Sequence, residues 1–340
     1  MAHVSGSRRA LAATVFALIL ALPSLSQDAG LPPPEEGARE RLNSSPRHGE
    51  WVSFDASRGG SPRDMLSAWI VYPERPDPAP IVIVVHEIFG LSDWVRAVAD
   101  QLAAEGFIAI APDLLSGKAP GGAGSRAVDA DGARSLIAGL DPVEIARRLD
   151  ATADYALALP AAATKFGIVG FCWGGGVSFD YATRRQDLGA SVSFYGIAPP
   201  AQAIARINAP VLAFYGGSDE RVTSTEAPAG MEFQRLGKHF EYGIYPGAGH
   251  AFMRQQGGQN GANLEAAKES WPRMLAFLKA ELAGSEAGAA PASRSALALD
   301  EDGCDGSCCS PPQAAGLAQA ASLPQAASLA QAEPTSPGLR

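Results

Sequence analysis

The sequence is short of the features that mark several classes of protein. Its 340 residues include only four cysteines, and three of them, Cys304, Cys308 and Cys309, lie close together, so the chain has no disulfide framework. Lys and Arg total 27 against 36 Asp and Glu, a formal net charge of -9. This balance leaves no broad basic surface to neutralise phosphates, so we expect no nucleic acid partner.

The apolar run near the N-terminus, from Ala10 to Leu22, is too short to cross a membrane, which takes about 20 residues. It follows Arg8-Arg9 and precedes the small residues Ser24 and Ser26. This order predicts an export signal peptide over residues 1–26, with a buried N-terminal helix as the alternative. We expect a periplasmic or secreted protein with no stable membrane span after signal removal. The arginine pair resembles a twin-arginine signal, and the general secretory route is the alternative.

The other end of the chain, residues 285–340, contains no aromatic residue and is rich in Ala, Ser, Pro, Gly and Gln. Such a composition buries too little apolar surface to offset the ordering entropy, so it predicts a disordered tail. The cysteine cluster in this tail lacks a fourth ligand and any nearby His, which disfavours a zinc site over an exposed disulfide or no role. With a linker over 27–44, one domain remains at 45–284.

Within this domain, short apolar runs alternate with longer amphipathic stretches. The apolar runs predict strands buried on both faces of a parallel sheet, at Ile81–Val85, Phe107–Ala111, Phe166–Val169, Ala190–Phe194 and Val211–Tyr215. The amphipathic stretches predict helices at Trp94–Ala104, Pro142–Leu157, Gly175–Thr183, Thr225–Leu236 and Leu264–Leu282. The alternation predicts an α/β fold with a mostly parallel, doubly wound sheet and helices on both faces, whose chemistry lies beyond the carboxyl ends of the strands.

The loop after one predicted strand reads Gly170-Phe171-Cys172-Trp173-Gly174-Gly175 and opens a helix. Cys172 takes the place of the serine in the G-x-S-x-G nucleophile elbow of α/β-hydrolases, where glycines allow a sharp strand-to-helix turn. The amides at the helix start favour a thiolate at Cys172, and the backbone N–H of Trp173 can donate to an oxyanion. A buried structural cysteine in a glycine-rich turn is the alternative.

The order of the remaining chemical groups supports the elbow. Hydrolases of this fold place an acid after a later strand and a histidine after the last one. Asp219 follows the strand that ends at Tyr215, and His250 follows a predicted strand at Phe240–Tyr245. The residues alone therefore predict Cys172 as nucleophile, His250 as general base and Asp219 as the acid that orients it.

The predicted domain at 45–284 resembles the dienelactone hydrolase family of α/β-hydrolases, whose members use Cys at the elbow. The matching segments are His86-Glu87-Ile88-Phe89-Gly90, Pro112-Asp113-Leu114, Gly170 to Gly175, Asp219 and Gly249-His250-Ala251-Phe252. The resemblance implies that Glu87 contacts the resting thiol and helps to activate it, and that the amide of Ile88 completes the oxyanion hole.

The resemblance also implies a site for a substrate carboxylate. Arg254, four residues past His250, matches the arginine that binds this group in the family's lactonase. A second arginine normally follows the Pro-Asp-Leu segment, whereas this chain continues to Lys118, which offers a point charge without the bidentate fork. We therefore expect Arg254 and Lys118 as substrate-binding residues with a modest preference for carboxylates.

These residues together predict a monomeric hydrolase that cleaves a small-molecule ester or lactone through a thioester acyl-enzyme, similar to carboxymethylenebutenolidase. The chemistry needs no metal and no organic cofactor. Two alternatives stay open. One is a non-catalytic exported binding protein on a hydrolase scaffold, since fold does not imply activity. The other is a thiol-based redox protein that uses Cys172, which would need a resolving cysteine.

Overall fold

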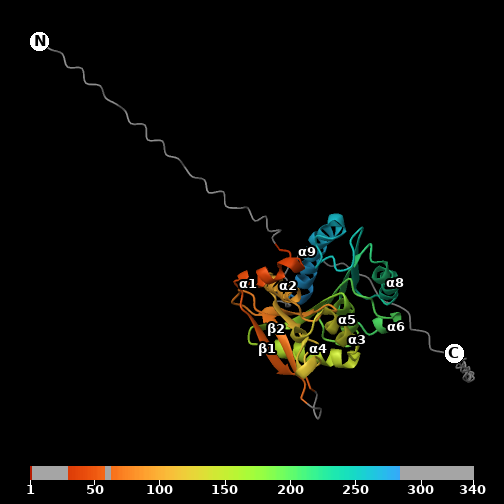
Figure 1. Ribbon diagram of the computed structural model, residues 1–340. Coiled ribbons are helices and arrows are strands. Elements are labelled where there is room, and N and C mark those ends of the chain that lie inside the picture. Colours follow the sequence, from red (N-terminus) through yellow and green to blue (C-terminus); the bar gives the residue numbers. More distant parts are fainter. Residues whose placement is uncertain (2–29, 58–62, 284–340) are drawn as a thin grey trace, which may run out of the picture. The chain divides into compact units, whose positions relative to one another are not determined.

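The computed structural model describes Met1 and residues 30–57 and 63–283 (Figure 1). The remainder of the predicted export signal, the predicted tail and its cysteines Cys304, Cys308 and Cys309 lie outside the described residues. Within the described ranges, no helix is long and apolar enough to cross a membrane.

One sheet of eight strands forms the centre of the described chain, in the order β1-β2-β4-β3-β5-β6-β7-β8. The strands from β3 to β8 run parallel to one another, whereas β2 pairs antiparallel with both β1 and β4. Their bounds are β1 Gly49–Asp55, β2 Met65–Val71, β3 Ala79–Val85, β4 Ile108–Pro112, β5 Ala162–Phe171, β6 Ala190–Phe194, β7 Val211–Gly216 and β8 Phe240–Tyr245. The predicted mostly parallel sheet is therefore confirmed.

Helices follow most of the parallel strands, as the alternation predicted. The α-helices are α1 Ala38–Ser44, α2 Asp93–Ala104, α3 Ala130–Ala138, α4 Pro142–Leu157, α5 Trp173–Ala182, α6 Ala201–Ile204, α7 Glu220–Thr223, α8 Glu226–Arg235 and α9 Ala262–Leu282. Short 3-10 turns are η1 Glu35–Gly37, η2 Pro120–Gly122, η3 Ser125–Ala127 and η4 Gln259–Gly261. The pattern missed β1 and β2, because β1 alternates between intermediate and exposed positions and has no continuous apolar run.

The core divides into two layers because the parallel strands are buried on both faces. Side chains of α2 and α9 pack on one face, with Trp94 and Trp271 among the largest. Side chains of α4, α5 and α8 pack on the other face. Figure 1 shows the sheet held between these helices. Such burial fixes the strands, so the loops at their carboxyl ends are held in place by the core.

The segment predicted as a linker differs from that expectation where the structure describes it. From Glu35 it forms η1 and then α1, which packs against α2. The indole nitrogen of Trp94 donates to the carbonyl of Pro33 at 3.0 Å, and Arg41 pairs with the buried Asp100 at 3.0 Å. These contacts with α2 hold the segment against the domain. No local apolar pattern in the sequence predicts them.

Candidate active site

Cys172 lies on a strained turn between β5 and α5. Its φ is 57° and its ψ is -119°, a conformation that few residues other than glycine adopt, and its amide donates to the carbonyl of Phe194 at 3.0 Å. A Cβ at Gly170 would lie 1.8 Å from the carbonyl oxygen of Gly174, and one at Gly174 would lie 2.4 Å from that of His86. Glycine is required at both positions, so the motif holds the thiol at the end of the sheet.

The structure brings Cys172, His250 and Asp219 together from three separate loops. Nε2 of His250 lies 3.0 Å from Sγ of Cys172, and Nδ1 lies 2.5 Å from Oδ2 of Asp219. Because a carboxylate only accepts, Asp219 accepts a hydrogen bond from the N–H at Nδ1, which leaves the lone pair of Nε2 facing the thiol. The side chain of Asp219 is 9% exposed and that of His250 is 32% exposed, so the imidazole is open to a ligand while its acid is shielded.

Two backbone amides converge on the same sulfur. The N–H groups of Trp173, at the start of α5, and of Ile88, after β3, both hydrogen-bond Cys172 and lower the pKa of its thiol. Donors held in this way can also receive an oxygen that becomes negative beside the sulfur. Ile88 and Trp173 therefore stand where an oxyanion hole is expected.

The net pKa of Cys172 is nevertheless raised, against the expectation that the helix amides favour a thiolate. Burial of the sulfur is the largest cause, followed by the negative charge of Glu87, and these outweigh the two amides and Arg221. The resting group is thus a thiol whose proton faces His250. Arg221 is an exposed residue after Asp219 that also lines the cavity, and nothing in the motifs singled it out.

Glu87 lies buried beside the sulfur, with 2% of its surface exposed. The carboxylate of Glu87 pairs with Arg254, whose Nε lies 2.6 Å away, whereas the sulfur contacts His250. Burial raises the pKa of Glu87 to about 7, although Arg254 acts in the opposite direction. The buried ring of Tyr195, at a φ of 40°, lies edge-on to His250 at 5.1 Å and completes this side of the site.

Arg254 is held between two carboxylates. Besides Glu87, it contacts Glu35 of the N-terminal segment, and its guanidinium lies 4.8 Å from the ring of Phe89. Its side chain is only 10% exposed. The arginine expected to bind a substrate carboxylate is therefore already paired, and one of its two partners, Glu35, carried no sequence signal.

Lys118 lies elsewhere. Its ammonium pairs with Glu144 of α4 at 2.7 Å, and it is not among the residues that line the cavity at Cys172. The structure therefore does not bring Lys118 to Arg254. The prediction that Lys118 supplies the second cation of a carboxylate site is wrong. The flexible, glycine-rich loop around it left its direction open in the sequence.

A cavity of about 460 Å³ opens at these groups. It is lined by Glu87, Ile88, Phe89, Cys172, Trp173, Gly176, Tyr195, Ile197, Arg221, Val222, His250, Ala251 and Arg254. His86 stays behind this wall, stacked on Trp173 at 5.4 Å, and burial lowers its pKa, so it remains neutral. Among the described residues, no three His, Cys, Asp or Glu side chains are grouped to hold a metal ion.

Comparison with known proteins finds a matching family, related sequences and a related solved structure. The family model described as "Dienelactone hydrolase family" matches residues 66–282. Proteins named "Putative carboxymethylenebutenolidase" from Salmonella typhimurium and Yersinia pestis are 33% and 31% identical; the matches cover 62% and 69% of this chain and 82% and 91% of theirs. A solved dienelactone hydrolase-like promiscuous phosphotriesterase from metagenomic libraries has 27% identity and a TM-score of 0.58, covering 69% of this chain and 99% of that one.

Proposed function

Because the chain belongs to the dienelactone hydrolase family and is a hydrolase that acts on esters or lactones, we propose that Cys172 is its nucleophile. His250 is the general base in this proposal, and Asp219 orients it. The observation that carries the assignment is the unbroken contact from Asp219 through both nitrogens of His250 to the sulfur, at 2.5 and 3.0 Å.

The first half of the reaction forms a thioester. Nε2 of His250 takes the proton from Cys172 as Sγ bonds to the carbonyl carbon, and the carbonyl oxygen becomes an oxyanion that accepts from the amides of Ile88 and Trp173. One such donor is typically worth about 3 kcal/mol in the transition state. The bond from carbon to the leaving oxygen then breaks, and His250 returns its proton to that oxygen.

The second half releases the acid. A water molecule gives a proton to His250 as its oxygen attacks the thioester carbon, and the carbon–sulfur bond breaks. The proton then returns to Sγ of Cys172, which restores the resting thiol. Glu87, with a pKa near 7, keeps this thiol protonated when it is ionised, because its charge opposes a thiolate. The sulfur therefore stays a thiol until an ester carbonyl binds, when the two amides can stabilise the negative charge that forms on the carbonyl oxygen.

The alternatives have less support. A redox role would need a resolving cysteine, and Cys172 is the free cysteine of the described chain. A binding protein without catalysis would not need the aligned imidazole or the converging amides. Carboxymethylenebutenolidase activity in particular has less support. Arg254 already pairs with Glu87 and Glu35, and Lys118 lies outside the cavity.

The experiment is hydrolysis of simple 4-nitrophenyl esters and lactones by the full chain and by Cys172→Ala. We expect the variant to lose all measurable hydrolysis and the wild type to show a thioester adduct on the peptide that contains Cys172, by mass spectrometry of the quenched enzyme. A matched control replaces the other three cysteines, Cys304, Cys308 and Cys309, by serine and should keep full activity. Full activity of Cys172→Ala would refute the assignment.

The compartment is a separate proposal, that the chain is exported. It is supported by the order of Arg8-Arg9, the apolar run and the small residues before Gln27. The native protein should then have an N-terminus near Gln27 and lie outside the cytoplasm, as mass spectrometry of fractionated cells would show. Replacing both arginines by lysine should stop export only if the twin-arginine route is used. A cytoplasmic protein that retains Met1 would contradict the proposal.

A further inference from the structure

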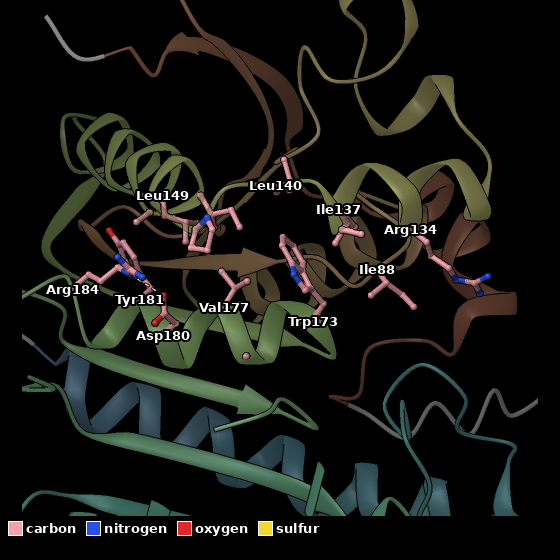
Figure 2. Close-up of a pocket in the computed structure, with 15 residues that line it drawn as sticks. Ile88, Arg134, Ile137, Leu140, Leu149, Trp173, Val177, Asp180, Tyr181 and Arg184 are labelled. Carbon is pink, nitrogen blue, oxygen red and sulfur yellow. Dashed lines mark hydrogen bonds and ion pairs between the residues drawn. The ribbon is translucent and has the colours of Figure 1, made fainter. Parts of the chain in front are cut away.

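A second cavity lies beside the catalytic one, between α5 on one side and α3 and α4 on the other. Its volume is about 620 Å³. Figure 2 shows Leu149 and Leu140 on one wall facing Val177 and Trp173 on the other. Ile137 adds a further aliphatic side chain from α3. The walls of this cavity are therefore mostly aliphatic and aromatic, which suits an apolar ligand.

The two cavities share part of their walls. Ile88, Trp173 and Gly176 line both of them. Two of these residues supply the amides that point to Cys172. The third, Gly176, has no side chain and so adds no bulk between the cavities. The two cavities therefore adjoin at the amides that point to Cys172.

The charged residues at the rim of the second cavity are already paired. Arg184, just past the end of α5, pairs with Asp180 of that helix at 2.8 Å. Arg134 pairs with Asp131 at 2.7 Å and lies 5.0 Å from the ring of Phe89. These pairs leave neither arginine without a counter-charge, and the apolar walls favour an uncharged ligand.

The chemistry of His250 decides which half of an ester lies here. The imidazole must return its proton to the leaving oxygen, so the alcohol half lies on the side of His250. His250 lines the catalytic cavity and is absent from the lining of the second one, whereas Ile88 and Trp173 are common to both. The acyl half is therefore the part that faces the second cavity.

We propose that the second cavity is an acyl-binding site for an uncharged aliphatic chain, an inference that rests on the proposed function. From Trp173 to Arg184 the wall follows α5 and the turn after it, a length of about 16 Å at 1.5 Å per residue. This length accommodates a medium-chain acyl group. Each methylene buried in the transition state raises kcat/KM by a factor of about four.

The test compares 4-nitrophenyl acetate with 4-nitrophenyl octanoate, which share one leaving group. We expect the wild type to have a kcat/KM at least about tenfold higher for the octanoate, because burial of only two of its six further methylenes already gives about 16-fold. Val177→Trp fills the cavity from α5, and Ala146→Phe fills it from α4. Each variant should lose most of the preference, so that the ratio of the two kcat/KM values falls about tenfold.

Two controls separate this effect from damage to the fold. Val143→Trp adds the same bulk on α4 at a side chain that is 68% exposed and outside the cavity, and it should keep the wild-type ratio. The acetates of short and long alcohols vary only the leaving half, and Val177→Trp should not change the ratio of their rates. Thermal melts check that each variant folds. The two substitutions fill the cavity from opposite walls, so if one variant does not fold, the other still tests the inference.

The outcomes distinguish the inference from the proposed function. If wild type hydrolyses both esters without a preference for octanoate, or if both cavity variants keep the preference, the acyl site is refuted while the function stands. A chain-length effect in the alcohol series instead would also refute it. If neither ester is hydrolysed and Cys172 forms no thioester, the proposed function fails, and the acyl site fails with it.

Discussion

The carboxylate of Glu35 contacts the guanidinium of Arg254, from a position 219 residues earlier in the chain. Glu87 contacts Nε of the same guanidinium at 2.6 Å. The N-terminal segment thus places its own carboxylate on the arginine that would otherwise be available to a carboxylate of the substrate. This relationship predicts that substrate preference depends on a residue outside the strands and loops that carry the proposed reacting groups.

Removing that carboxylate should change substrate preference. Glu35→Gln leaves Arg254 with Glu87 alone, so we expect kcat/KM for a carboxylate-bearing lactone to rise relative to its methyl ester. The side chain of Glu35 is 54% exposed, and a pair of this kind is worth about 0.2–1 kcal/mol, or about 1.4- to 5-fold. Glu36→Gln is the matched control and should leave the ratio unchanged. An unchanged ratio in Glu35→Gln would show that Arg254 does not reach the substrate.

Glu87 should control the reactivity of the resting thiol. Because the charge of Glu87 raises the pKa of Cys172, Glu87→Gln should lower that pKa and move the alkylation profile to lower pH. The effect belongs to the ionised carboxylate, whose pKa is about 7, so it should be largest above that pH and fade below it. Peptide-resolved mass spectrometry after iodoacetamide treatment isolates Cys172 from the other cysteines. Slower alkylation of the variant at about pH 8 would contradict the electrostatic relationship.

Asp219 should act through the orientation of His250. In Asp219→Asn, the amide can donate to Nδ1, which favours the tautomer that carries its proton on Nε2 and cannot accept from the thiol. We expect kcat to fall by about 10²- to 10⁴-fold with little change in KM. Steady-state kinetics on a short-chain ester measures the effect. Glu220→Gln, an exposed neighbour, serves as the control, and an equal loss there would argue for a structural cause.

The elbow should tolerate no side chain at Gly170. Alanine there would place its Cβ 1.8 Å from the backbone oxygen of Gly174, so the turn must move. We expect Gly170→Ala to cost at least about 3 kcal/mol of unfolding free energy, measured by urea denaturation. Gly257→Ala, where a Cβ meets no atom within 4 Å, should remain near wild type. A Gly170→Ala protein of unchanged stability would show that the turn is less tightly packed than described.

Much of the fold and the order of the candidate site could be read from the sequence. Continuous apolar runs marked the strands from β3 to β7, because strands buried on both faces need apolar residues at every position. The glycines around Cys172 marked the turn, because no side chain fits beside it. The order of Cys172, Asp219 and His250 then followed from strands that end at one edge of the sheet. These are local signals, each contained in a few neighbouring residues.

Only the tertiary structure decided what surrounds those groups. The helix start predicted a lowered pKa at Cys172, but burial and the charge of Glu87 raise it, and neither is visible in the elbow motif. Lys118 turns to Glu144, while Glu35 reaches Arg254 from the supposed linker. The second cavity likewise exists only where α3, α4 and α5 meet. Burial, ion pairing and cavity shape depend on residues that are distant in the chain, whereas strand and turn patterns depend on neighbouring residues. The sequence by itself therefore determined the candidate reacting groups. The packing of the fold decided what surrounds them.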